Sequence, residues 1–297
     1  MMGNVDDREP TGGRTIGAPR AHWIGDGFLI RRYITRTAAL RRSVGPFLLL
    51  DHHAPFAYPP TPFERGLDPH PHRGFETVTV VFEGTLAHRD SAGARGTIGP
   101  GDVQWMTAGR GILHREYHDP SFALSGGRLH MLQLWVNLPA AQKMTEPRYQ
   151  ALRSHAIPTV TLPDGRGTVR VIAGAFAGIA GAATTATPVV VLDAVLADGC
   201  VLPVDVEPAH AAAVLVIGGH ASIDGGCIAE SGDFVILDRT ERKIAIEARS
   251  PRTHVFVITG EPIDEPLVAR GPYFMNTEDE LRLAYADQRA GGFGRLA

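Results

Sequence analysis

Four residues in the first half of the chain have side chains that could bind one metal ion. His70 and His72 lie in DPHPHRGFE, and His114 and Glu116 lie in GRGILHRE. Each pair is spaced i, i+2, and side chains at this spacing on a β-strand point to the same face. Two strands with inward-facing pairs would therefore bring all four side chains to one point. Three imidazoles and one carboxylate suit iron(II), manganese, nickel, copper or zinc better than magnesium or calcium.

A second acidic side chain competes for the place of the carboxylate ligand. Glu76 follows His72 by four residues, so an unbroken strand would direct it to the same face. The spacing alone does not choose between Glu76 and Glu116. The carboxylate that does not bind the metal is expected to orient a histidine.

Composition excludes several functional classes. The chain has 297 residues, which suits two domains, and a formal net charge of -3 without a basic stripe, so direct nucleic-acid binding is not expected. No signal peptide precedes an apolar segment, and no apolar run reaches about 18 residues, so we expect a cytoplasmic protein. Cys200 and Cys227 are expected as buried thiols, and the sequence does not decide whether they pair.

Short apolar runs predict the fold class. Segments such as TVTVVFEG and LHMLQLWVNL are rich in Val, Leu and aromatic residues and are bounded by Gly and Pro, which is typical of strands. The chain is therefore predicted to be all-β. One helix is predicted in NTEDELRLAYADQRAGG, where Thr277 and Glu280 form a capping-box pattern and Gly291 supplies a stop.

A faint internal repeat supports two similar domains. Residues 80–106 and 215–237 share a pattern of strand, Gly turn, strand, Gly-Asp and strand, with Gly101-Asp102 matching Gly232-Asp233. The boundary is expected in the proline-punctuated stretch 140–165. In the second copy, the positions that match His70 and His72 are expected near Val204–Glu207, and the match of His114 near Ala245. The second domain is therefore predicted to lack a metal.

Longer motifs resemble a known family. HPHRGFETVTVVFEG, PGDVQWMTAGRGILHRE, RLHMLQLWVNLPAAQKMTEPRYQ and GPYFMNTEDEL are similar to the pirin family of the cupin superfamily. The resemblance implies a bicupin: two stacked antiparallel β-barrels, jelly-roll-like, with a short C-terminal helix. We expect a disordered extension over 1–15, a metal-binding cupin over 16–145, and a cupin without metal ligands, including the helix, over 146–297.

The same resemblance implies a site and an activity. Family ligand motifs map onto His70, His72, His114 and Glu116 and imply mononuclear Fe(II), with other divalent first-row metals as alternatives. The implied reaction is the 2,4-dioxygenation of a flavonol such as quercetin, a small aromatic substrate, by dioxygen, with Glu116 as catalytic base. The side chains expected around the ligands or along the pocket are Glu76, His52, His53, Phe75 and Met106. The alternative is a non-enzymatic, metal- or redox-dependent regulator that binds a transcription factor or a metabolic enzyme.

Overall fold

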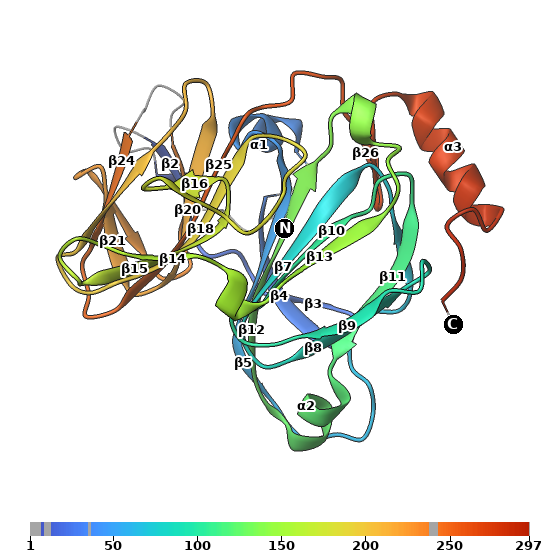
Figure 1. Ribbon diagram of the computed structural model, residues 1–297, viewed down its shortest axis with the longest axis horizontal. Coiled ribbons are helices and arrows are strands. Elements are labelled where there is room, and N and C mark those ends of the chain that lie inside the picture. Colours follow the sequence, from blue (N-terminus) through green and yellow to red (C-terminus); the bar gives the residue numbers. More distant parts are fainter. Residues whose placement is uncertain (1–6, 9–12, 35–36, 238–242, 297) are drawn as a thin grey trace. The chain divides into compact units, whose positions relative to one another are not determined.

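The computed structural model describes residues 7–8, 13–34, 37–237 and 243–296, and most of them form β-strands (Figure 1). Contacts divide the chain into two compact units. The first barrel comprises Ala21–Ile34, Phe47–Ser154 and Ile263–Ala297, and the second barrel comprises Met1–Arg20, Thr35–Pro46 and His155–Pro262. The predicted all-β class with two barrels is confirmed.

The first barrel contains two antiparallel sheets. One has seven strands in the order β13-β10-β7-β12-β5-β4-β3, and the other has four in the order β6-β11-β8-β9. The elements are β3 (His22–Ile24), β4 (Phe28–Ile34), β5 (Phe47–Tyr58), β6 (His70–His72), β7 (Phe75–Glu83), β8 (Leu86–Asp90), β9 (Arg95–Ile98), β10 (Val103–Thr107), β11 (Ile112–His118), α2 (Pro120–Ser125), β12 (Gly127–Asn137), the 3-10 helix η1 (Ala140–Gln142), β13 (Arg148–Leu152), the hairpin β26 (Val268–Arg270) and β27 (Tyr273–Met275), and α3 (Glu278–Arg289).

The second barrel repeats this plan. Its large sheet has the order β1-β2-β23-β20-β25-β18-β15-β14, and its small sheet has the order β19-β24-β21-β22. The elements are β1 (Asp7–Arg8), β2 (Gly13–Ile16), α1 (Ala38–Ser43), β14 (Thr159–Thr161), β15 (Gly167–Ala173), β16 (Ala175–Phe176), β17 (Ile179–Ala180), β18 (Val189–Leu196), β19 (Val201–Asp205), β20 (Ala211–Gly218), β21 (His220–Ile223), β22 (Cys227–Glu230), β23 (Phe234–Leu237), β24 (Lys243–Ala248) and β25 (Thr253–Gly260). A 3-10 helix, η2 (Ser154–Ala156), lies at the division between the units.

The predicted Gly-Asp repeat is confirmed as one turn built twice. Asp102 Oδ2 accepts a hydrogen bond from the backbone N–H of Gly99, and Asp233 Oδ2 accepts one from Glu230. The glycine before each aspartate has a positive φ, of 83° and 94°, a conformation that glycine adopts without strain. The turns join β9 to β10 and β22 to β23, so strands of the two barrels can be matched one by one.

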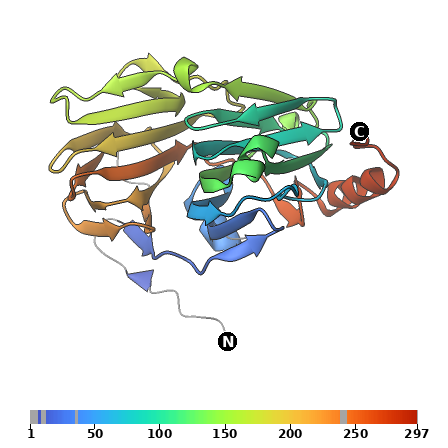
Figure 2. The ribbon, with the colours of Figure 1, turned by 90° about the horizontal axis from the view of Figure 1, so that it is seen from below.

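The domain limits differ from those expected at both ends of the chain. β2 pairs with β23 in the place that β13 takes beside β10 in the first barrel (Figure 2). Of the expected extension 1–15, residues 1–6 and 9–12 lie outside the described residues, while Asp7–Arg8 and part of β2 are strands. Residues 263–297, with α3, belong to the first barrel and not to the second. An open sheet edge gains hydrogen bonds from any strand that reaches it, so sequence order does not dictate which segment fills it.

The predicted C-terminal helix is confirmed as α3. Thr277 Oγ1 accepts a hydrogen bond from the Glu280 N–H, and Glu280 Oε2 accepts one from the Thr277 N–H, which completes the capping box. No helix among the described residues is long and apolar enough to cross a membrane. Cys200 and Cys227 are buried free thiols in the apolar core of the second barrel.

Candidate metal centre

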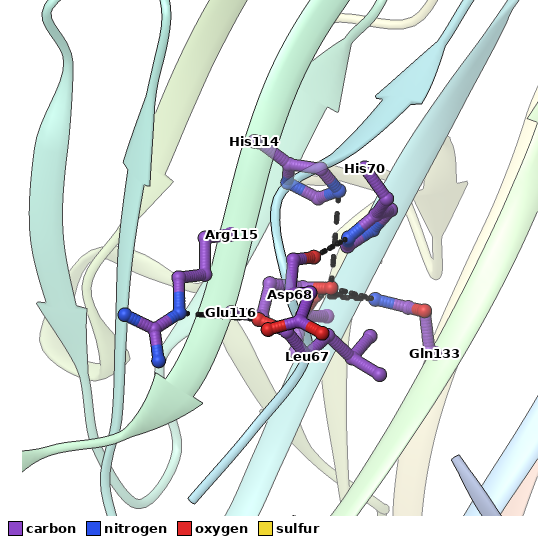
Figure 3. Close-up of polar contacts among 8 residues, drawn as sticks. Leu67, Asp68, His70, His114, Arg115, Glu116 and Gln133 are labelled. Carbon is purple, nitrogen blue, oxygen red and sulfur yellow. Dashed lines mark hydrogen bonds and ion pairs between the residues drawn. The ribbon is translucent and has the colours of Figure 1, made fainter. Parts of the chain in front are cut away.

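Three histidines converge on the small sheet of the first barrel. β6 pairs with β11 so that His70 lies directly opposite His114, and His72 lies opposite Ile112. The three imidazole ring centroids are 4.4–4.8 Å apart, and one nitrogen of each lies within 4.8 Å of the others. Figure 3 shows His70 and His114 directed toward each other. This trio could hold a metal ion.

The surroundings favour the ligating form of these histidines. Burial lowers the pKa of His72 and of His114 well below the usual value, and nearby His70 lowers both further. Neutral imidazole offers the lone pair that a metal needs. For His70 a hydrogen bond selects the nitrogen: Nδ1 lies 2.9 Å from the Asp68 carbonyl oxygen. A carbonyl only accepts, so Nδ1 carries the hydrogen and Nε2 is left for a metal.

Several nitrogens of the trio are buried without a hydrogen-bond partner among the described residues. They are Nδ1 of His72 and both ring nitrogens of His114. Buried polar atoms in folded proteins nearly always have a partner. A metal ion bound by one nitrogen of each histidine would supply a partner at this place, so the donor atoms fit the predicted group.

Glu116 places a carboxylate beside the trio. Its Oε2 lies 4.0 Å from His114 Nε2 (Figure 3). The Gln133 amide donates to both carboxylate oxygens at 3.0 and 3.2 Å, and the Thr79 hydroxyl donates to Oε1 at 3.3 Å. These contacts orient a carboxylate that is buried with little exposure to water. The geometry therefore offers three nitrogen donors and one oxygen donor.

Glu76 lies elsewhere, and the reason is a break in the strand. Gly74 has a φ of 88° between β6 and β7, so alternation does not continue from His72 to Glu76. On β7, Thr79 contacts Glu116 and therefore faces the metal centre, while Glu76 has the opposite parity. Glu76 instead accepts a 2.6 Å hydrogen bond from the Thr107 hydroxyl, and burial raises the pKa of Glu76.

The other expected pocket residues are separated by the fold. Phe75 packs its ring 5.0 Å from that of His72, so it touches a candidate ligand. Met106 is buried in a small apolar cluster with Ile112 and Tyr149. His53 hydrogen-bonds the Tyr58 hydroxyl, and the His52 and His130 Nε2 atoms lie 3.0 Å apart.

A cavity borders Glu116 on one side, and sequence reasoning did not name most of its walls. Its apolar walls come from Ile24, Phe28, Ile30, Leu67 and Met131, and its polar walls are Asp51, Glu116 and Gln133. None of the five side chains that were expected around the pocket lines this cavity. The signal for two of the wall residues was nonetheless present, because Asp51 and Gln133 are polar residues inside apolar strand segments.

The second barrel has apolar side chains where the first has its candidate ligands. The turn between Ser91 and Leu113 matches that between Asp224 and Ala245, and both close with a backbone hydrogen bond of 2.9 Å. Strand registers then assign the counterparts of His70, His72, His114 and Glu116 to Leu202, Val204, Ile246 and Ala248. This corrects the expected positions, which were near Val204–Glu207 for the first pair and one residue early for His114. All four counterparts belong to the apolar core.

Known proteins share both the sequence and the fold. The family model described as Pirin matches residues 27–136, and the Pirin C-terminal cupin domain matches residues 191–294. A Pseudomonas aeruginosa protein whose name gives quercetin 2,3-dioxygenase as a provisional activity is 45% identical over 94% of this chain and 96% of its own. Human pirin is 38% identical over 91% of this chain and 90% of its own. A crystal structure of a quercetin 2,3-dioxygenase from Acinetobacter baumannii has a TM-score of 0.91 and 41% identity, and the match covers 95% of this chain and 98% of that one.

Proposed function

Because the chain belongs to the pirin family, we propose that it is a flavonol dioxygenase of the quercetin type that acts in the first barrel. The observation that carries the proposal is the convergence of three histidines and Glu116 beside a mainly apolar cavity. The proposed reaction is the 2,4-dioxygenation of the flavonol, which opens the heterocycle and releases carbon monoxide. Relatives named for quercetin 2,3-dioxygenase activity support this substrate class.

We infer that His70, His72, His114 and Glu116 would hold one ion, with iron(II) as the proposed metal. Three nitrogens and one oxygen suit iron and other divalent first-row metals. An iron(II) ion held there would supply redox chemistry and open positions for a flavonol oxygen and dioxygen. The cytoplasm that the sequence predicts is a reducing compartment, which would favour the ferrous state.

The protein's own residues would contribute a base and a dry cavity. Glu116 lies where the cavity meets the histidines, so it can take the proton from the flavonol hydroxyl as that oxygen approaches the metal site. Gln133 and Thr79 hold the carboxylate by hydrogen bonds to its oxygens, which orients it for this transfer. The apolar walls exclude water and pack against the flat rings of the substrate.

The test is oxygen uptake with quercetin by protein that has been stripped of metal and reloaded anaerobically with iron(II). Uptake should require iron and should vanish in His114→Ala. Glu116→Gln should remain folded and bind quercetin, yet lose turnover by about 100-fold or more, as expected for a general base.

Glu76→Gln is the matched control, because it removes a buried carboxylate from the same barrel outside the histidine trio. It should keep most of the turnover. Full activity in Glu116→Gln would remove Glu116 from the mechanism. Stoichiometric iron binding without uptake of oxygen would contradict the dioxygenase proposal and favour the regulatory alternative.

A further inference from the structure

A row of polar side chains crosses the inside of the first barrel. Arg32, Asp51, Gln133, Thr79 and Gln104 lie on β4, β5, β12, β7 and β10, and each is directly opposite the next in strand register. Residues directly opposite in an antiparallel pair project to the same face of the sheet. Contacts confirm the shared face, because Gln133 and Thr79 both bind Glu116.

The matching row in the second barrel is entirely apolar. The Gly-Asp turns align β10 with β23 and β7 with β20, and the remaining strands follow in the same sheet order. The counterparts in strand order are Val171, Leu192, Val257, Val214 and Val235, again directly opposite one another. All five are fully buried core residues. The fold is therefore built without this polar row, and its presence in the first barrel needs a functional reason.

Part of the row has a reason already, but Arg32 and Asp51 do not. Gln133 and Thr79 orient Glu116. Asp51 is buried and held by two hydrogen bonds from Arg32, Nε to Oδ1 at 2.7 Å and Nη2 to Oδ2 at 2.6 Å. Asp51 nevertheless lines the cavity next to Gln133. Each carboxylate oxygen has a second lone pair, so Asp51 presents an oriented acceptor in a cavity with mainly apolar walls.

We propose that Asp51, held in place by Arg32, is a specificity-determining residue that accepts a hydrogen bond from a phenolic hydroxyl of the substrate remote from the metal centre. This inference rests on the proposed function and deepens it. The substrate class becomes flat, polyhydroxylated aromatic compounds, of which one hydroxyl reaches Glu116 and another reaches Asp51. A carboxylate with a fixed orientation accepts from a hydroxyl but offers nothing to an unsubstituted ring.

The expected selectivity is moderate. Arg32 already satisfies both oxygens of Asp51, so a substrate without the second hydroxyl does not leave the carboxylate bare. The loss is then that of one hydrogen bond to a charged group, which corresponds to a factor of about 10 to 100 in affinity.

The experiment compares quercetin, which carries hydroxyls on both ring systems, with 3-hydroxyflavone, which carries only the hydroxyl expected at the metal. Both are measured with the iron-loaded enzyme, for kcat and KM by oxygen uptake and for Kd by anaerobic titration. The double variant Arg32→Val with Asp51→Leu installs the pair that the second barrel has at this place. It should weaken quercetin binding by about 10- to 100-fold and leave 3-hydroxyflavone unchanged, with the effect in KM and Kd rather than kcat.

Two further variants separate a subsite from a packing effect. Asp51→Asn keeps an oxygen acceptor and should lose less quercetin affinity than the double variant. Arg128→Gln removes a largely exposed ion pair with Glu83 on the same sheet and should leave both flavonols unaffected. Equal loss for both flavonols, or no change in either, would overturn the subsite.

Failure of the subsite and failure of the proposed function give different results. If the wild-type enzyme turns over neither flavonol, the dioxygenase proposal fails. The Kd values still decide the subsite in that case, because a preference for quercetin that is lost in the double variant supports it. Equal Kd values for the two flavonols in the wild type, or no binding of either, would refute the subsite.

Discussion

Asp287→Asn tests whether the C-terminal helix stabilises the candidate metal centre. Arg73 directly follows His72, and its buried guanidinium donates to Asp287 Oδ2 at 2.8 Å. It also donates to the Arg110 carbonyl and lies 4.7 Å from the centre of the Phe293 ring. The segment that carries Asp287 and Phe293 therefore grips the residue next to a candidate ligand.

The structure sets both the size and the sign of the effect. A hydrogen bond between charged groups contributes about 1.5–3 kcal/mol. The Asp287 side chain is 36% exposed and Arg73 only 5%, so screening on one side reduces this to about 1–2 kcal/mol. Asp287 lies in the last turn of α3, where the helix dipole disfavours a negative charge. Without the contact to Arg73, Asp287→Asn would stabilise the protein by a few tenths of a kcal/mol.

The assay is thermal and urea unfolding of the metal-free protein, followed by titration with iron(II). We expect a loss of about 1–2 kcal/mol, or roughly 2–8 °C in Tm. Iron should bind about five-fold more weakly, because about 1 kcal/mol of the loss reaches the position of His72. Glu278→Gln is the control: it lies on the same helix, and its contact with Arg270 spans 3.8 Å between largely exposed side chains.

A double-mutant cycle with Arg73→Gln isolates the pair. The two changes together should cost less than the sum of the single changes, because each removes the same contact. Unchanged or raised stability in Asp287→Asn, or strict additivity with Arg73→Gln, would refute the reasoning.

Three further outcomes follow from buried groups in the first barrel. Burial lowers the pKa of Lys143 to about 7 from 10.5, so the folded chain binds fewer protons than the unfolded chain between these values, and stability should rise with pH across this window. Urea unfolding from pH 7 to pH 10 should show that rise in the wild type and a flatter profile in Lys143→Met; parallel profiles would contradict the shift. Gly74→Ala should cost more than about 2 kcal/mol in thermal unfolding, because φ is positive and a Cβ would overlap the Phe274 carbonyl oxygen; a neutral result would exclude strain at this turn. Removal of iron with a chelator should lower Tm, and excess iron should restore it in a concentration-dependent way; a Tm independent of iron would argue against a site in the folded state.

Local patterns were enough to find most of the site and the repeat. Two i, i+2 pairs identified His70, His72 and His114 because alternation is a property of any extended strand. The Gly-Asp turn appeared twice because its hydrogen bonds lie within a few residues of one another. The capping box of α3 was visible for the same reason, since Thr277 and Glu280 satisfy each other locally.

Long-range pairing decided what local patterns left open. Parity favoured Glu76 equally with Glu116 until Gly74 was seen to break the strand between β6 and β7. The cavity walls could not be listed from the sequence, because Asp51 and Gln133 meet only when β5 pairs with β12. A single polar residue inside an apolar run does not reveal its neighbour across the sheet.

The sequence by itself determined the all-β class, the repeat, the family and the histidine pairs, because each is encoded by residues close together in the chain. Only the tertiary structure decided that β2 completes the second barrel, that α3 belongs to the first, and that Arg32 and Asp51 continue a polar row from the metal centre. The physical reason is that sheet edges and buried acceptors are satisfied by whichever segment reaches them in space.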